Sequence, residues 1–150
     1  HYDGGLKVPF MLRWPGQIEE GSTSDYQGLT FDIFPTFLEL AGAKPREDLD
    51  AVSLKPILKG GKIDAPRELY FVRREGGPRG GKAYHAIIKD GWKLMQNSPF
   101  SPLELYHLEK DPYETTDLAS KNPGKKRALL NRLRHHIQRG GATPWQQPSQ

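Results

Sequence analysis

The stretch AYHAIIKDGWKLMQN, residues 83–97, decides the fold of the larger part of this chain. A strand pattern flanks Asp90-Gly91 on both sides, and Asp-Gly is favoured in two-residue hairpin turns because both positions need a positive φ. The pattern therefore predicts an antiparallel hairpin with its turn at Asp90-Gly91. Leu69–Val72 and Leu103–Leu108 are predicted as two further strands of the same sheet.

A helix is expected after these strands. Asn122 can cap its start, Pro123 suits its first turn, and Gly140-Gly141 ends it. The apolar residues of this segment form a single stripe, which consists of Leu129, Leu130, Leu133 and Ile137. An antiparallel sheet of about four strands packed on this helix buries one face and forms a small α+β fold.

The first sixty residues show a different pattern. Val8–Trp14 is an apolar run stopped by a Pro-Gly pair, which predicts a buried strand. Thr30–Ala41 has apolar residues at helical spacing around a wide face, which predicts a well-buried helix. Ser53–Leu58 is expected to form one short helical turn. Because a single strand and helix do not complete a sheet, we place a boundary near Gly60–Pro66.

Composition narrows the class of protein. The chain has 150 residues, of which 27% are charged and 35% hydrophobic, as in globular proteins. It has no cysteine, which excludes disulfides and thiolate metal sites within these residues. Residues 121–150 hold seven Lys or Arg and no acid, so the formal charge of +4 becomes −3 without them. We interpret this segment as a solvated helix face, with a nucleic-acid- or anion-binding arm as the alternative.

A glycine-rich stretch, GGPRGGKA at residues 76–83, has nearly the spacing of a phosphate-binding loop. Ala83 stands where such a loop needs Ser or Thr, and a strand pattern follows in place of a helix. We therefore interpret it as a connection between two strands. The basic residues in and beside this stretch are candidates for a rim that faces an anionic substrate, with simple solvation as the alternative. These candidates are Arg74, Arg79, Lys82 and His85.

The chain shows no catalytic constellation. His135 and His136 are adjacent, so they point to different sides of a helix, and His107 stands alone in a strand pattern. None has metal-ligand spacing with a carboxylate, and no G-x-S-x-G motif occurs. We expect neither catalytic residues nor metal ligands among these residues.

Read in order, several stretches resemble the C-terminal portion of the sulfatase family, of the arylsulfatase type. The match runs from Tyr2 to Ala119. It departs from the family pattern at Asp3 and Lys7, where Glu and Arg are usual, and at Ala51, which replaces a common Gly. The resembling stretches are YDGGLKVPFMLRWPGQIEEGSTSD, TFDIFPTFLELAGA, AVSLKPILKG, AIIKDGWKLM and LELYHLEKDPYETTDLA.

The resemblance implies an alkaline-phosphatase-like α/β fold. Residues 1–62 would be the C-terminal end of the large domain, with its last strand and helix. Residues 63–142 would be the smaller C-terminal subdomain, which closes one side of the active-site pocket in the family, and residues 143–150 a flexible tail. Asp3, Gly4 and Gly5 would shape the chain near the sulfate site, in a structural role.

The resemblance also implies hydrolysis of sulfate esters by a formylglycine nucleophile with the help of calcium. The nucleophile motif C/S-x-P-x-R does not occur here, and the family's calcium and sulfate ligands lie upstream. This chain would therefore bind no cofactor, contribute pocket wall and substrate rim, and be inactive alone. We interpret His1 as a cut point in a longer protein.

The expected partner of the full-length enzyme is a sulfated small molecule or saccharide, with no nucleic acid and no membrane. Family members are commonly exported, which implies a periplasmic or secreted protein. The exposed faces of the first sixty residues predict self-association of the fragment. Three alternatives stay open: a free-standing anionic-saccharide-binding module, a basic-helix nucleic-acid binder, and a phosphatase or phosphonate hydrolase of the same superfamily.

Overall fold

The computed structural model describes residues 2–44, 46, 48–64, 66–74, 83–98 and 100–141. It divides into two compact units. The sheet unit comprises His1–Val8 and Pro66–Gln150, and the helical unit comprises Pro9–Ala65. The division of the chain into residues 1–62, 63–142 and 143–150 stays a prediction, and the last of these segments lies outside the described residues.

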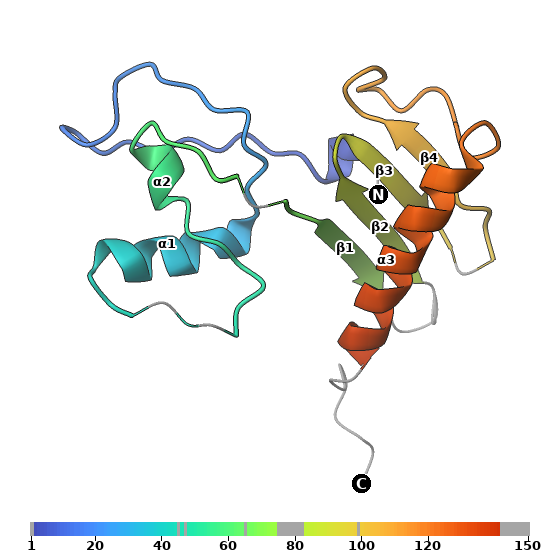
Figure 1. Ribbon diagram of the computed structural model, residues 1–150. Helices are drawn as coiled ribbons and strands as arrows, with labels where there is room; N and C mark the ends of the chain where they lie inside the picture. Colours follow the sequence, from blue (N-terminus) through green and yellow to red (C-terminus); the bar gives the residue numbers. More distant parts are fainter. Residues whose placement is uncertain are drawn as a thin grey trace, which may run out of the picture. The chain divides into compact units, whose positions relative to one another are not determined.

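The sheet unit contains four antiparallel strands in the order β1-β2-β3-β4 (Figure 1). Each strand follows its neighbour along the chain, so every connection joins adjacent strands. The bounds are β1 Leu69–Arg74, β2 Ala83–Lys89, β3 Trp92–Gln96 and β4 Glu104–His107. The predicted sheet of about four strands is confirmed. The turn between β2 and β3 has φ values of 51° at Asp90 and 72° at Gly91, as predicted for the Asp-Gly pair.

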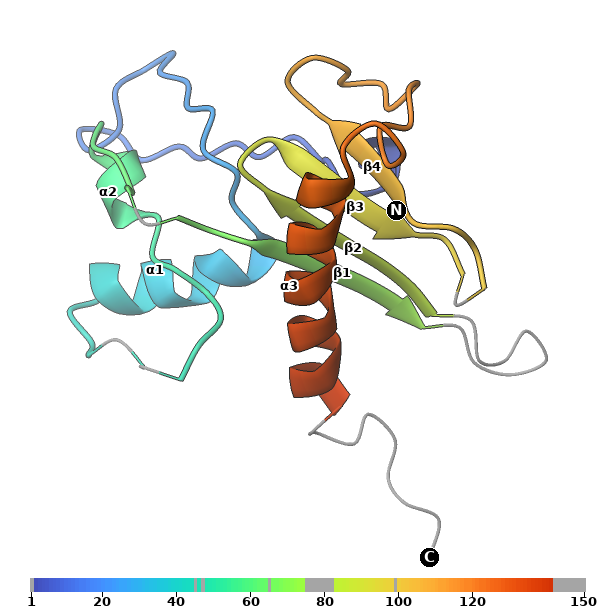
Figure 2. The ribbon, with the colours of Figure 1, turned by 45° about the vertical axis from the view of Figure 1, so that its right-hand side comes forward.

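Helix α3, Pro123–Gly141, crosses one face of this sheet (Figure 2). The strand register forms a row of directly paired residues across the sheet, one from each strand, so their side chains share a face. The row consists of Tyr70, Ile87, Leu94 and Leu105. Three of them join a buried cluster with residues of α3. The cluster consists of Ile87, Leu94, Leu105, Ala119, Leu129 and Leu133, with Leu130 and Ile137 packed against it. The predicted apolar stripe of the helix is confirmed.

The other face of the sheet carries the next row of paired residues, which is Leu69, Ile88, Lys93 and Tyr106. All four are buried, and the row is apolar apart from the ammonium of Lys93 and the hydroxyl of Tyr106. The short 3-10 helix η1, Asp3–Gly5, belongs to the same unit and supplies a carboxylate to Lys93. The start of the chain therefore completes the polar part of this face.

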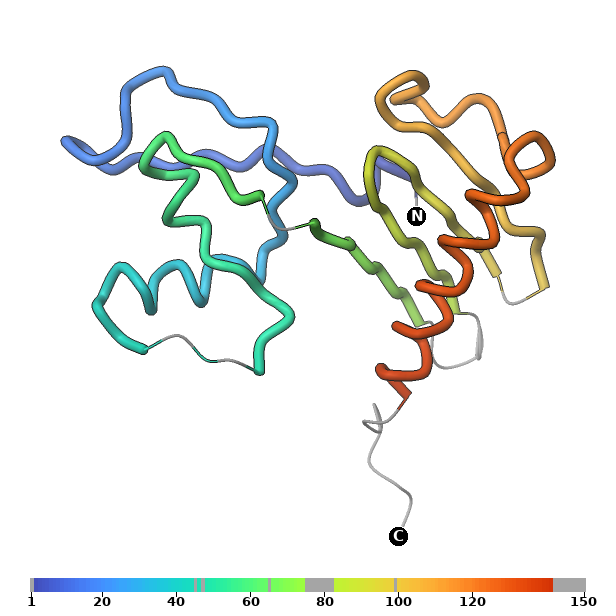
Figure 3. The backbone as a smooth tube through the Cα atoms, in the orientation of Figure 1, coloured from blue at the N-terminus to red at the C-terminus, as the bar shows by residue number. Residues whose placement is uncertain are grey.

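The helical unit consists of η2 Thr30–Asp32, α1 Ile33–Leu40 and α2 Lys55–Leu58, joined by loops (Figure 3). The predicted helix near Thr30–Ala41 and the predicted turn near Ser53–Leu58 are thus confirmed. Two buried polar residues tie them together. Asp32 accepts backbone N–H bonds from Leu29 and Val52 at 2.7 and 3.0 Å, and the Thr36 hydroxyl accepts one from Leu54 at 2.8 Å.

Two expectations about the first sixty residues are wrong in this chain. Val8–Trp14 lies outside any helix or strand, and Val8, Phe10 and Met11 are exposed. A strand needs a hydrogen-bonded neighbour, and no described residue pairs with this run. Helix α1 was expected to be well buried, but Phe34 and Phe37 are more than half exposed.

Candidate functional site

A buried ion cluster joins the start of the chain to the sheet. The ammonium of Lys93 in β3 lies 3.0 Å from Asp3 Oδ1 and 2.7 Å from Glu114 Oε1, and the Lys93 side chain is fully buried. The backbone N–H of Asp3 donates to Glu114 Oε2 at 2.6 Å. One lysine thus lies between two carboxylates that come from segments 111 residues apart. Charge pairing of this kind is what allows a lysine to be buried.

The backbone around Glu114 is shaped by a local turn. Glu114 has a φ of 55°, in the left-handed region that non-glycine residues seldom adopt. Asp111 holds the turn, because its Oδ2 accepts N–H bonds from Thr115 at 2.8 Å and Thr116 at 2.9 Å. These bonds lower the pKa of the Asp111 carboxyl. The sequence DPYET therefore fixes where the Glu114 side chain reaches Lys93.

Asp3 is held by three groups, whereas the glycines beside it are not constrained. Lys7 lies 3.4 Å from Asp3 Oδ2, which adds a more exposed ion pair to the cluster. A Cβ added at Gly4 or Gly5 would meet nothing within 4 Å, and neither residue has a positive φ. These contacts tie Asp3 to the sheet unit, and the structural role expected of Asp3, Gly4 and Gly5 near a sulfate site stays a prediction.

A second polar group lies beside the cluster. The hydroxyls of Tyr2 and Tyr106 both donate to Glu104 Oε2, at 2.9 and 2.6 Å, and Asn97 donates to Glu104 Oε1 at 3.1 Å. Burial, followed by the Glu104 carboxylate, raises the pKa of Tyr106, and the bond to Glu104 raises that of Tyr2. Both phenols therefore stay protonated and act as hydrogen-bond donors.

The predicted rim residues fall in different environments. Arg74 ends β1 and is exposed, as a rim residue must be. His85 in β2 is only 8% exposed, and its Nδ1 lies 2.9 Å from the Tyr70 hydroxyl. Burial, followed by the charge of Arg74, lowers the pKa of His85, which favours the neutral ring. Arg79 and Lys82 lie outside the described residues.

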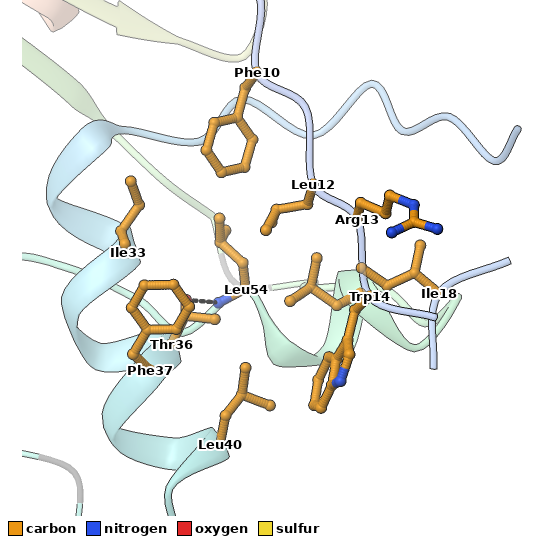
Figure 4. Close-up of a pocket in the computed structure, with 11 residues that line it drawn as sticks. Phe10, Leu12, Arg13, Trp14, Ile18, Ile33, Thr36, Phe37, Leu40 and Leu54 are labelled. Atoms are coloured by element: carbon orange, nitrogen blue, oxygen red, sulfur yellow. Dashed lines mark hydrogen bonds between the residues drawn. The ribbon is translucent and has the colours of Figure 1, made fainter. Parts of the chain in front are cut away.

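The helical unit contains an apolar pocket of about 430 Å³ (Figure 4). Leu12, Trp14, Ile33 and Leu54 point into it from the N-terminal segment, α1 and the residues before α2. The other lining residues are Phe10, Arg13, Ile18, Thr36, Phe37, Leu40 and Leu58. Arg13 is the one charged residue among the lining residues. The pocket has the character of an incomplete core, because a site for an anion needs several converging polar donors.

Two searches of the described residues gave no further site. No three His, Cys, Asp or Glu side chains in this part of the chain gather closely enough to hold a metal ion. Across the same residues, no helix combines the length and the apolar character that crossing a membrane requires.

Residues 1–141 match the family described as N-sulphoglucosamine sulphohydrolase, C-terminal, and the chain belongs to this family. An ulvan-active sulfatase of Formosa agariphila is 35% identical over 156 residues, which cover 83% of this chain and 31% of that protein. An N-acetylglucosamine-6-O-sulfatase of Bacteroides thetaiotaomicron is 28% identical, over 92% of this chain and 26% of that protein.

The similarity extends to the fold. A structure solved with its substrate, D-glucosamine-2-N,6-O-disulfate, has a TM-score of 0.70 and 26% identity to this chain. The match covers 84% of this chain and 27% of that one. The chain therefore spans about a third or less of the proteins it resembles, and it corresponds to a C-terminal region of sulfatases with the alkaline-phosphatase-like fold.

Sequence reasoning identified Asp3 but missed its two partners. Lys93 interrupts the apolar run of β3, and a lysine on a predicted buried strand requires a carboxylate nearby. That signal was available in the sequence, although it does not choose among the acids. Glu114 was hidden because its side chain is placed by an irregular turn with a left-handed residue, which no periodic pattern indicates.

Proposed function

We propose that this chain is the C-terminal region of a sulfatase that hydrolyses sulfate esters on a carbohydrate, with the catalytic core upstream. The family match over residues 1–141 carries this proposal. The relatives support the substrate class, since one is named an ulvan-active sulfatase and another an N-acetylglucosamine-6-O-sulfatase. Export to the periplasm or medium belongs to the same proposal.

Formylglycine and calcium would belong to the upstream region. Among the described residues, no three His, Cys, Asp or Glu side chains gather in a group that could hold a metal ion. The motif from which formylglycine forms does not occur in the sequence. We therefore assign no chemical step to this chain. Its proposed contribution is to support the fold and to supply part of the pocket wall.

Within that proposal, the buried ion cluster of Lys93, Asp3 and Glu114 positions the start of the chain on the sheet. It holds Asp3 on the sheet by an ion pair and holds the Asp3 backbone through Glu114. The chain that enters the helical unit at Pro9 is thereby fixed at one end. Arg74, with Arg79 and Lys82 of the following connection, would face the anionic substrate, since guanidinium groups pair well with sulfate.

The proposed function is tested by sulfate release. The complete protein is expected to release sulfate from N-acetylglucosamine 6-sulfate or a sulfated oligosaccharide, and the 150-residue chain alone is expected to release none. Sulfate release by the chain alone would refute an upstream catalytic core. Hydrolysis of a phosphonate monoester in preference to every sulfate ester would favour the phosphonate hydrolase alternative.

The rim is tested separately with Arg74→Ala in the complete protein. Loss of one charged contact to substrate is expected to raise KM by roughly fivefold with little change in kcat. Lys110→Ala, an exposed lysine on the turn after β4, is the matched control. An unchanged KM for Arg74→Ala would remove Arg74 from the rim.

A further inference from the structure

Helix α3 presents a solvent-exposed row of four polar residues, two of which are arginines. Leu129 and Leu133 are buried against the sheet, whereas Arg127, Asn131, Arg134 and Gln138 are all exposed. Their spacing of four, three and four residues places them in one row along the helix. At about 1.5 Å per residue, Arg127 and Arg134 lie roughly 10 Å apart along the axis.

The charge at the N-terminal end of this helix does not favour the helix itself, whereas Arg139 in the last turn does. The segment from Leu118 to Gln150 contains no Asp or Glu, and α3 holds six Lys or Arg. Lys125 and Lys126 lie in its first turn, where the helix dipole favours acids and disfavours cations. A helix that keeps cations at its positive end, with no acid to compensate, is suited to an external anion.

Some of these cations have intramolecular contacts and others do not. Arg132 pairs with Glu68, and the Lys125 ammonium lies 5.6 Å from the centre of the Trp92 ring. Among the described residues, Arg127 and Arg134 form no salt bridge. Two guanidinium groups on one exposed row are therefore available to a ligand.

We propose that the exposed face of α3, centred on Arg127 and Arg134, binds a sulfated polysaccharide chain. Arginine suits sulfate because its planar fork donates two parallel hydrogen bonds. A linear polymer can reach both cations, whereas one sulfate group cannot span them. Asn131 and Gln138 add amide groups that can bond sugar hydroxyls. The row has no aromatic residue on which nucleic-acid bases could stack, which favours the polysaccharide over a single-stranded nucleic acid.

The inference rests on the proposed sulfatase function for the chemical class of the ligand. In that setting, the α3 face would hold a polymeric substrate close to the enzyme between hydrolytic events. Binding through surface cations is electrostatic, so it weakens steeply as salt concentration rises.

The test measures binding of the complete protein to dextran sulfate, with uncharged dextran and a short DNA duplex as comparison ligands. The double variant Arg127→Gln/Arg134→Gln is expected to raise the Kd for dextran sulfate by roughly tenfold. The Kd of this variant should also depend less steeply on salt concentration. Gln is a good helix former and both sites are exposed, so folding is retained. The matched control is Lys59→Gln/Lys62→Gln, which removes two exposed cations from the helical unit.

Equal weakening by the control, no effect of the α3 variant, or tighter binding to DNA than to dextran sulfate would each overturn the inference. Its failure is distinguishable from failure of the proposed function. Sulfate release without any dextran sulfate binding would overturn this inference alone. If dextran sulfate binding depends on Arg127 and Arg134 but the complete protein releases no sulfate, this inference is supported and the proposed sulfatase function is refuted.

Discussion

Lys93 links the start of the chain to the turn after β4, because it forms ion pairs with Asp3 and Glu114. It lies within a strand, on a face that is otherwise mostly apolar, and contacts one carboxylate from residue 3 and another from residue 114. Removing the ammonium would leave two acids close together with little solvent to separate their charges. A buried ion pair contributes little net stability compared with apolar residues, but breaking one side of it is costly.

Lys93→Met is therefore expected to lower the free energy of unfolding by about 3–5 kcal/mol. Urea unfolding followed by circular dichroism measures this change. Lys110→Met, at an exposed position after β4, is the control and is expected to change stability by about 0.5 kcal/mol or less. A loss at Lys93 no larger than that of the control would show that the cluster does not hold the fold.

His85 makes stability depend on pH. Burial and Arg74 lower its pKa below the usual value of 6.5, so the folded state resists protonation more than the unfolded state does. At low pH the unfolded chain therefore binds more protons than the folded one. The stability that the neutral His85 ring contributes is lost as the pH falls below about 6.5, toward the lower pKa of the folded state.

The expected result is a lower free energy of unfolding at pH 5 than at pH 7.5, with a smaller difference in His85→Gln. Gln keeps an acceptor for the Tyr70 hydroxyl but does not titrate. Subtracting the two pH profiles removes the contributions of the ionisable groups that the two proteins share. Identical profiles for the two proteins would contradict the lowered pKa.

At the scale of elements, the sheet unit was predictable and the helical unit only in part. The hairpin pattern around Asp90-Gly91 and the stripe of α3 are local patterns, and both were confirmed because their partners lie within the same unit. Val8–Trp14 was wrongly predicted as a buried strand, since apolar composition indicates burial without showing which neighbour provides it. The same reason explains why α1 formed as predicted but remained exposed.

The hairpin turn gives the sharpest test of an element. Gly91→Ala places a side chain at a φ of 72°, where an L-residue is strained, and is expected to cost about 1–2 kcal/mol. Its Cβ would also lie 3.0 Å from the mobile end of Glu109. Gly124→Ala is the matched control, because nothing lies within 4 Å and the helix gains up to about 1 kcal/mol. Equal effects of the two changes would contradict the turn geometry.

At the scale of the whole molecule, the two units differ in how complete they are. The sheet unit has a buried cluster on one face and a paired charge on the other. The helical unit exposes large side chains and holds an apolar pocket, although Asp32 and Thr36 organise its backbone. Exposed apolar surface of this kind marks an interface, and we propose that the rest of a sulfatase covers it.

Hydrogen exchange in α1 tests that account most directly, in the complete protein and in the 150-residue chain. If residues 9–65 complete their fold against the upstream region, amides of Ile33–Leu40 will exchange roughly tenfold or more slowly in the complete protein. The amides of β2 and β3, within the sheet unit, should exchange at similar rates in both and serve as the internal control. Equal protection of α1 in both proteins would contradict the claim that this chain is one part of a larger enzyme fold.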